Sequence, residues 1–83
     1  MKPLTQYAVM AEKHWRRFLP RMTANLEATG RLETLLLEAE ERTEAEMDEL
    51  RRHFLQQGLT AERAQHRAWE VVRQRYIYLP PEF

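Results

Sequence analysis

The sequence predicts an all-α fold of three to four helices, arranged as a helical hairpin or small bundle with a long middle helix. Alternating strand patterns never extend beyond a few residues. Apolar residues instead recur three and four positions apart, as they do on one face of an amphipathic helix. Two glycines and four prolines are the only breakers in 83 residues, so one helical domain over residues 1–83 is expected.

The first helix is expected at about residues 5–19. Its apolar face joins Leu4, Ala8, Ala11, Trp15 and Phe18, widened by Tyr7, Val9 and Met10. Pro20 should end or kink this helix, because proline lacks an amide proton and its ring collides with the preceding turn. A second stretch, about 20–29, continues the apolar stripe up to Gly30. A glycine there can adopt the left-handed conformation that closes a helix.

The long middle helix is expected at about residues 31–57, ended by Gly58. Its apolar face steps by four, three, four, four, three and four: Leu32, Leu36, Ala39, Thr43, Met47, Leu50 and Phe54. The consecutive steps of four predict a nearly straight helix. At 1.5 Å per residue it measures about 40 Å, so we expect either that it protrudes or that another chain lies along it.

The last helix is expected at about residues 60–79, with Thr60 as its N-cap and Pro80 and Pro81 after it. Its predicted stripe is Gln65, Trp69, Val72, Tyr76 and Leu79, flanked by Ala64, Ala68 and Val71. We expect the aromatic residues of this stripe, Trp69 and Tyr76, to pack near Leu50 and Phe54.

The end of the sequence carries apolar residues that leave this stripe, namely Ile77, Tyr78 and Phe83. They form more apolar surface than a short tail should expose alone. We therefore expect the tail to fold back beside Trp15 or to lie in an interface with a second copy or another partner.

The charges sum to zero but are unevenly distributed. Residues 1–31 and 51–75 are mainly basic, whereas residues 33–50 are mainly acidic. Such alternation indicates helices of opposite charge that lie against one another. It is less typical of a basic face for phosphate.

One basic stretch with aromatic residues, KHWRRFLPR, spans residues 13–21. Arginines bind phosphates in bidentate fashion, and aromatic rings stack on bases. The alternative is that the aromatic residues belong to the core while the arginines pair with the acidic middle helix. The candidate residues for binding a partner or nucleic acid are Lys13, Arg16, Arg17, Arg21, Tyr78 and Phe83.

The arginines themselves distinguish the two interpretations. A continuous face that includes Arg16, Arg17 and Arg21 would favour nucleic acid. Arginines paired with Glu40, Glu44 and their neighbours would favour protein binding.

The residue pattern indicates no catalytic or metal site. The histidines, His14, His53 and His66, lack the spacing of metal ligands on a helix. The acidic run EAEERTEAEMDEL, residues 38–50, lacks an enclosing apolar pocket, which predicts a solvated face or, alternatively, a docking surface for a basic partner. No glycine-rich phosphate loop or nucleophile elbow occurs. We expect no enzyme activity, no cofactor, no metal and no small-molecule substrate.

Composition also predicts the compartment. The chain has no cysteine and no apolar run near the roughly 20 residues that span a bilayer. Its N-terminal stretch carries Glu12 and Lys13 and does not match a signal peptide. We expect a cytoplasmic protein that does not enter a membrane.

The segment NLEATGRLETLL, residues 25–36, resembles the N-L-x-x-[ST]-G-[KR]-L segment of the small transposon-encoded TnpV proteins. The features after it are also similar: a long acidic helix, a Gly-Leu-Thr break at 58–60, and a helix with a tryptophan and an Ile-Tyr ending at 77–78. The stretch HWRRFL resembles the basic stretch that precedes the motif in that family, although the run from His14 to Asn25 is shorter here.

This resemblance covers about residues 13–78 and implies a small helical accessory protein of mobile genetic elements, with no catalytic residues to transfer. Together with the residue pattern, it predicts a non-catalytic protein that acts by binding a macromolecule. The first expectation is another protein, or a second copy in a homodimer. The alternative is a small nucleic-acid-binding module that uses the basic first helix.

Overall fold

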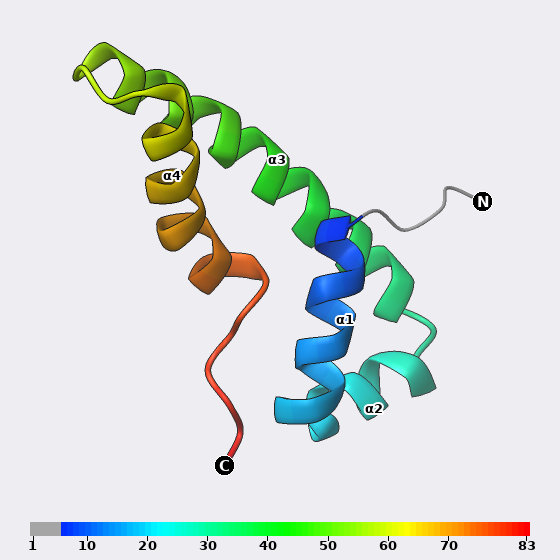
Figure 1. Cartoon of the computed structure of the whole chain (residues 1–83). Coiled ribbons are helices and arrows are strands. Elements are labelled where there is room, and N and C mark those ends of the chain that lie inside the picture. The colour runs from blue at the N-terminus through cyan, green and yellow to red at the C-terminus, as the bar shows by residue number, and fades with distance from the viewer. Residues whose placement is uncertain (1–5) are drawn as a thin grey trace.

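A computed structural model describes residues 6–83, which form four helices and a C-terminal tail (Figure 1). The helices are α1 (Gln6–Phe18), α2 (Pro20–Ala28), α3 (Leu32–Gln56) and α4 (Ala61–Tyr76). The all-α class and the long middle helix are confirmed. The predicted helix start at Thr5 and the stripe residue Leu4 lie outside the described residues.

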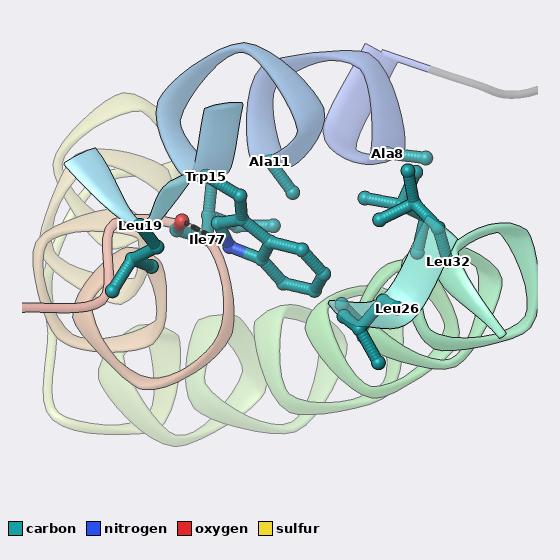
Figure 2. Packing of buried hydrophobic residues seen from close by; sticks show 9 residues of the cluster. Ala8, Ala11, Trp15, Leu19, Leu26, Leu32 and Ile77 are labelled. Atoms are coloured by element: carbon teal, nitrogen blue, oxygen red, sulfur yellow. Dashed lines mark hydrogen bonds between the residues drawn. The ribbon is translucent and has the colours of Figure 1, made fainter. Parts of the chain in front are cut away.

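The long helix α3 is the element on which the others pack. Figure 1 shows α1 beside the first half of α3 and α4 folded back along its second half. The first half carries a cluster of buried residues from α1, α2, α3 and the tail: Ala8, Ala11, Trp15, Leu19, Leu26, Leu32, Leu36, Ala39 and Ile77 (Figure 2). In the second half, Met47 of α3 packs against Ala68 and Val72 of α4. Helices and the tail of the same chain therefore cover the apolar stripe of α3, as the predicted helical hairpin requires, and no second chain is needed to cover it.

The buried face of α1 follows the predicted stripe with two differences. Ala8 and Ala11 are fully buried, and Trp15 is nearly so. Val9, expected to widen this face, is 38% exposed. Leu19 is more deeply buried than Phe18, because the chain turns at Pro20 and brings Leu19 toward the core.

The two predicted breaks on either side of α2 are confirmed. Leu19, between α1 and α2, has φ −130° and ψ 54°, and Pro20 opens α2, where a missing amide proton does no harm. Gly30 has φ +70° and follows the end of α2. The amide of Arg31 donates to the carbonyl oxygen of Leu26 over 2.8 Å, which closes the helix.

Gly30→Val should lower the free energy of unfolding by about 1–2 kcal/mol, because a side chain in the left-handed region meets its own backbone. A Cβ at this position would have no neighbour within 4 Å, so the penalty is conformational alone. Urea unfolding followed by circular dichroism measures it. Gly30→Asn is the matched control and should lose less, because asparagine tolerates this region. Equal losses would contradict the backbone explanation.

The buried line of α4 differs from the predicted one. The fully buried residues are Ala64, Ala68 and Val72, two of which were expected on the flank. Gln65, expected on the stripe, is exposed. Alanine side chains are short, so α4 can approach α3 closely along this line. Trp69 and Tyr76 are partly buried and pack on the Met47 cluster together with Leu50 and Phe54, as predicted.

The predicted start of α4 is confirmed, whereas its predicted end is wrong. Thr60 caps the helix, since its hydroxyl oxygen accepts from the amide of Arg63 over 3.2 Å. The predicted end at Leu79 is wrong, because the helix stops at Tyr76. Pro80 disfavours helical geometry at Leu79 and its ring would collide with the carbonyl of Tyr76. Ile77, expected outside the stripe, is fully buried in the first cluster.

Candidate binding surface

The tail folds back onto α1 through three hydrogen bonds. The indole N–H of Trp15 donates to the carbonyl oxygen of Ile77 over 3.1 Å, as Figure 2 shows. His14 Nε2 lies 2.8 Å from the carbonyl oxygen of Leu79, to which it donates. The amide of Glu82 donates to the carbonyl oxygen of Phe18 over 2.9 Å. The predicted position of the tail beside Trp15 is therefore confirmed.

Glu82 also serves as the cap of α2 from the other end of the sequence. Its Oε1 accepts from the amide of Arg21 over 3.0 Å, and its Oε2 accepts from the amide of Met22 over 2.9 Å. Leu19 stands at the N-cap position and provides no side-chain hydrogen bond. A carboxylate at a helix N-terminus satisfies free amides and interacts favourably with the helix dipole. The tail thus holds α1 and α2 together.

Glu82→Ala should lower the free energy of unfolding by about 0.5–2 kcal/mol, the usual loss when an N-cap acceptor is removed. Glu82→Gln should lose less, because the amide oxygen still accepts from one amide while the charge is gone. Thermal unfolding of the three proteins measures the difference. An alanine variant as stable as the original would show that the tail carboxylate does not cap α2.

The predicted cations of α1 and α2 have different surroundings. Arg16 forms ion pairs with Glu12 at 2.8 Å and with Glu27 at 2.5 Å. The hydrogen bonds that its guanidinium donates to these carboxylates raise its pKa above the ordinary value. Among residues 6–83, Lys13, Arg17 and Arg21 form no ion pair. All three are exposed. The charge of Arg16 is therefore balanced by two carboxylates, whereas Lys13, Arg17 and Arg21 have no ion pair among the described residues.

Neither of the two predicted arginine patterns is realised in full. Arg16 is paired, but with Glu12 and Glu27 rather than with Glu40 or Glu44. Arg17 lies with its guanidinium carbon 5.3 Å from the centre of the Phe18 ring, in a cation–π position.

The tail and α1 bring aromatic rings into a continuous file. Ring centres are 6.5 Å apart for Phe83 and Phe18, 4.7 Å for Phe18 and His14, and 5.1 Å for His14 and Tyr78. The file continues from Tyr78 to Trp69 at 6.1 Å and from Trp69 to Tyr7 at 5.5 Å. Each spacing lies in the range of ordinary aromatic pairs.

A shallow hollow of about 250 Å³ opens where the cations meet this file. It is lined by Met10, Lys13, His14, Arg17, Phe18 and Tyr78. Phe83, which is 82% exposed, continues the aromatic surface beyond Phe18. We call this set the basic–aromatic surface: Lys13, Arg17, Arg21, His14, Phe18, Tyr78 and Phe83.

Five of the six predicted binding residues belong to the basic–aromatic surface, and Arg16 does not. Sequence reasoning missed His14 and Glu82. The spacing of His14 to Phe18, four positions on one helix, was a signal for a shared face. No local signal marks Glu82, because its contacts with Arg21 and Met22 span about sixty residues.

A second polar contact joins α3 to α4. Glu46 pairs with Arg75 and accepts a hydrogen bond from the hydroxyl of Tyr76. This hydrogen bond, together with partial burial and the charge of Glu46, raises the pKa of Tyr76 above its ordinary value of 10.0. The neutral phenol is thus the form that the fold favours.

The phenol of Tyr76 should therefore ionise above pH 10, and Glu46→Gln should bring its midpoint back toward the ordinary value. Because the folded-state pKa is raised, this contact contributes its stability below pH 10 and loses it as pH rises through the folded pKa. Ultraviolet titration of phenolate absorbance measures the midpoint, and Tyr76→Phe assigns the signal. An unchanged titration in Glu46→Gln would contradict the role of the carboxylate.

Most acidic side chains of residues 38–50 on α3 are exposed, but Glu46 is partly buried and Glu40 is buried. Glu40 is 1% exposed and belongs to the buried face, together with the fully buried Thr43. The solvated face predicted for residues 38–50 therefore does not include Glu40. Within the described part of the chain, no group of three histidine, aspartate or glutamate side chains is placed to hold a metal ion.

No helix within residues 6–83 is both long enough and apolar enough to cross a bilayer. Comparison with protein-family models, with curated proteins and with solved structures finds no match to this chain. The resemblance to the TnpV proteins therefore stays a prediction from the motif residues.

Proposed function

We propose that this chain is a non-catalytic accessory protein of a mobile genetic element, located in the cytoplasm, that acts by binding a macromolecule. The observation that carries the proposal is the basic–aromatic surface. It presents three exposed cations without carboxylate ion pairs among the described residues. Two of them, Lys13 and Arg17, line an open hollow, and the Phe83 ring beyond it is exposed. The TnpV-like motif at residues 25–36 supports the mobile-element context.

The chemistry of this surface supports binding rather than catalysis. Glu82, the carboxylate next to Arg21, is engaged by two backbone amides and is not paired with a nucleophile. General acid–base chemistry needs a carboxylate held within reach of a reacting proton. The sequence places another protein first among partners and nucleic acid second. The exposed cations and rings favour the second.

Capture from a lysate of the native host tests this function. The immobilised full chain is compared with Lys13→Gln/Arg17→Gln/Arg21→Gln and with a matched control, Arg31→Gln/Arg63→Gln/Arg67→Gln, whose arginines are exposed and lie elsewhere. We expect a macromolecule that the original and the control retain and that the first variant loses. Nuclease and protease treatment identify its class. Identical captured material on all three proteins would contradict the proposal.

A further inference from the structure

We infer that the partner of the basic–aromatic surface is single-stranded nucleic acid, which binds along the file of rings with its phosphates toward Lys13, Arg17 and Arg21. This inference rests on the proposed function and deepens it by naming the partner class. Proteins that bind single strands without sequence preference combine cations that follow the backbone with aromatic rings on which bases stack. Both features meet at this surface.

The first step of the argument is the position of the cations. Lys13 and Arg17 are one turn apart on α1 and line the same hollow. Arg21 follows at the start of α2, whose N-terminus is held by Glu82 beside Phe18. A protein whose net charge is zero cannot attract a polyanion through its overall field. Binding must therefore depend on these few local cations, so we expect modest affinity.

The second step is the aromatic file. Phe83, Phe18, His14 and Tyr78 succeed one another at ring spacings of 6.5, 4.7 and 5.1 Å. All four are at least partly exposed, and Phe83 is 82% exposed. Most of the apolar surface of an exposed ring such as Phe83 can be removed from water only when a partner covers it. The flat face of a nucleobase is a partner of suitable chemistry.

The third step distinguishes single strands from duplexes. In a duplex the faces of the bases are stacked on one another, and a ring can reach them only after unstacking. The hollow and the rings of Phe83, Phe18, His14 and Tyr78 lie on an open surface built from α1 and the tail. They offer rings for splayed bases, which single strands present without that penalty.

The fourth step explains why the tail belongs to the site. It contributes Tyr78 and Phe83, and it is fixed by the hydrogen bonds from His14 to Leu79 and from Glu82 to Phe18. Rings held by such contacts are preorganised, so less ordering is needed on binding.

The test is fluorescence anisotropy of a labelled 12-nucleotide oligothymidylate with the full chain. Neutralisation of three phosphates in a single strand gives a slope of about −2 for log K against log salt, or roughly an 18-fold loss between 50 and 200 mM. Lys13→Gln/Arg17→Gln/Arg21→Gln should abolish binding, whereas the control Arg31→Gln/Arg63→Gln/Arg67→Gln should keep it. Phe83→Ala should weaken binding by about 5- to 150-fold, the usual effect of losing one stacked ring.

Three results would overturn the inference. They are no binding at low salt, equal losses in the two triple variants, and a duplex that binds as tightly as the single strand. A 12-residue oligoglutamate provides the protein-like arm of the same assay. If it binds as tightly as the oligothymidylate, the inference fails while the proposed function stands, because the surface then recognises acidic protein. If neither probe binds, the inference fails, and the lysate capture decides the proposed function independently.

Discussion

Trp15→Ala should lower the free energy of unfolding by about 3–5 kcal/mol, the loss expected when a buried tryptophan is removed. Trp15 is 4% exposed and belongs to the cluster in which α1, α2, α3 and the tail meet. A domain of this size has about 4–12 kcal/mol of stability in total. The substitution should therefore remove at least about a quarter of the total stability, and it should unfold much of the protein if that total is near the lower end of the range. Urea unfolding followed by circular dichroism measures the loss.

A milder substitution keeps this prediction testable if the alanine variant does not fold. Trp15→Phe keeps a ring but removes the N–H that donates to Ile77, which leaves a buried carbonyl oxygen without its partner. We expect a loss of about 1–3 kcal/mol. Trp69→Phe is the matched control, because the Trp69 indole is half-buried and donates no hydrogen bond among residues 6–83. Equal losses at the two positions would show that the bond to Ile77 contributes nothing.

Ile77→Ala should cost about 2–5 kcal/mol, because Ile77 is fully buried and its removal leaves a cavity between the tail and α1. Phe83→Ala, six residues further on, should change stability by no more than about 0.5 kcal/mol, since most of its ring is already in water.

Thermal unfolding of these two variants separates the tail into a structural part and a binding part. A stable Ile77→Ala protein would show that the tail does not complete the core. A strongly destabilised Phe83→Ala protein would show that the Phe83 ring is structural, and its effect on nucleic-acid binding would then have no simple interpretation.

The features that local sequence predicts well are those governed by one or two neighbouring residues. Pro20 and Gly30 mark real breaks, because each imposes a backbone geometry by itself. Thr60 caps α4 through a hydrogen bond to a residue three positions away. The stripe of α3 follows from helical periodicity alone.

The features that were missed depend on partners distant in sequence. The buried line of α4 is set by small residues, Ala64 and Ala68, which allow close approach to α3 and which a pattern of large apolar residues underrates. The end of α4 depends on Pro80 and on the hydrogen bonds that Trp15 and His14 donate to backbone carbonyl oxygens of the tail.

In the candidate surface, too, features set by neighbouring residues could be predicted and features set by distant residues could not. Lys13, Arg17 and Arg21 could be proposed from the sequence because they stand in one short basic stretch. Arg16 is paired with Glu27, which lies eleven residues away on another helix. An argument from the faces of a single helix cannot predict this ion pair. The aromatic file needs the tail to return over more than sixty residues, and periodicity contains no information on that return.

The carboxylate of Glu82 couples α2 to the tail, because it accepts from the amides of Arg21 and Met22. The hairpin of α3 and α4 is closed by a short connection, whereas α1 and the tail are joined by contacts 62 and 65 residues apart. Release of the tail frees the amides of Arg21 and Met22 and the indole of Trp15 in one event, while the packing of Met47 on Val72 is untouched. Amide hydrogen exchange in α2 should thus follow local opening of the tail rather than global unfolding. We therefore expect α2 to open together with the tail rather than with α3, the helix that follows it in sequence.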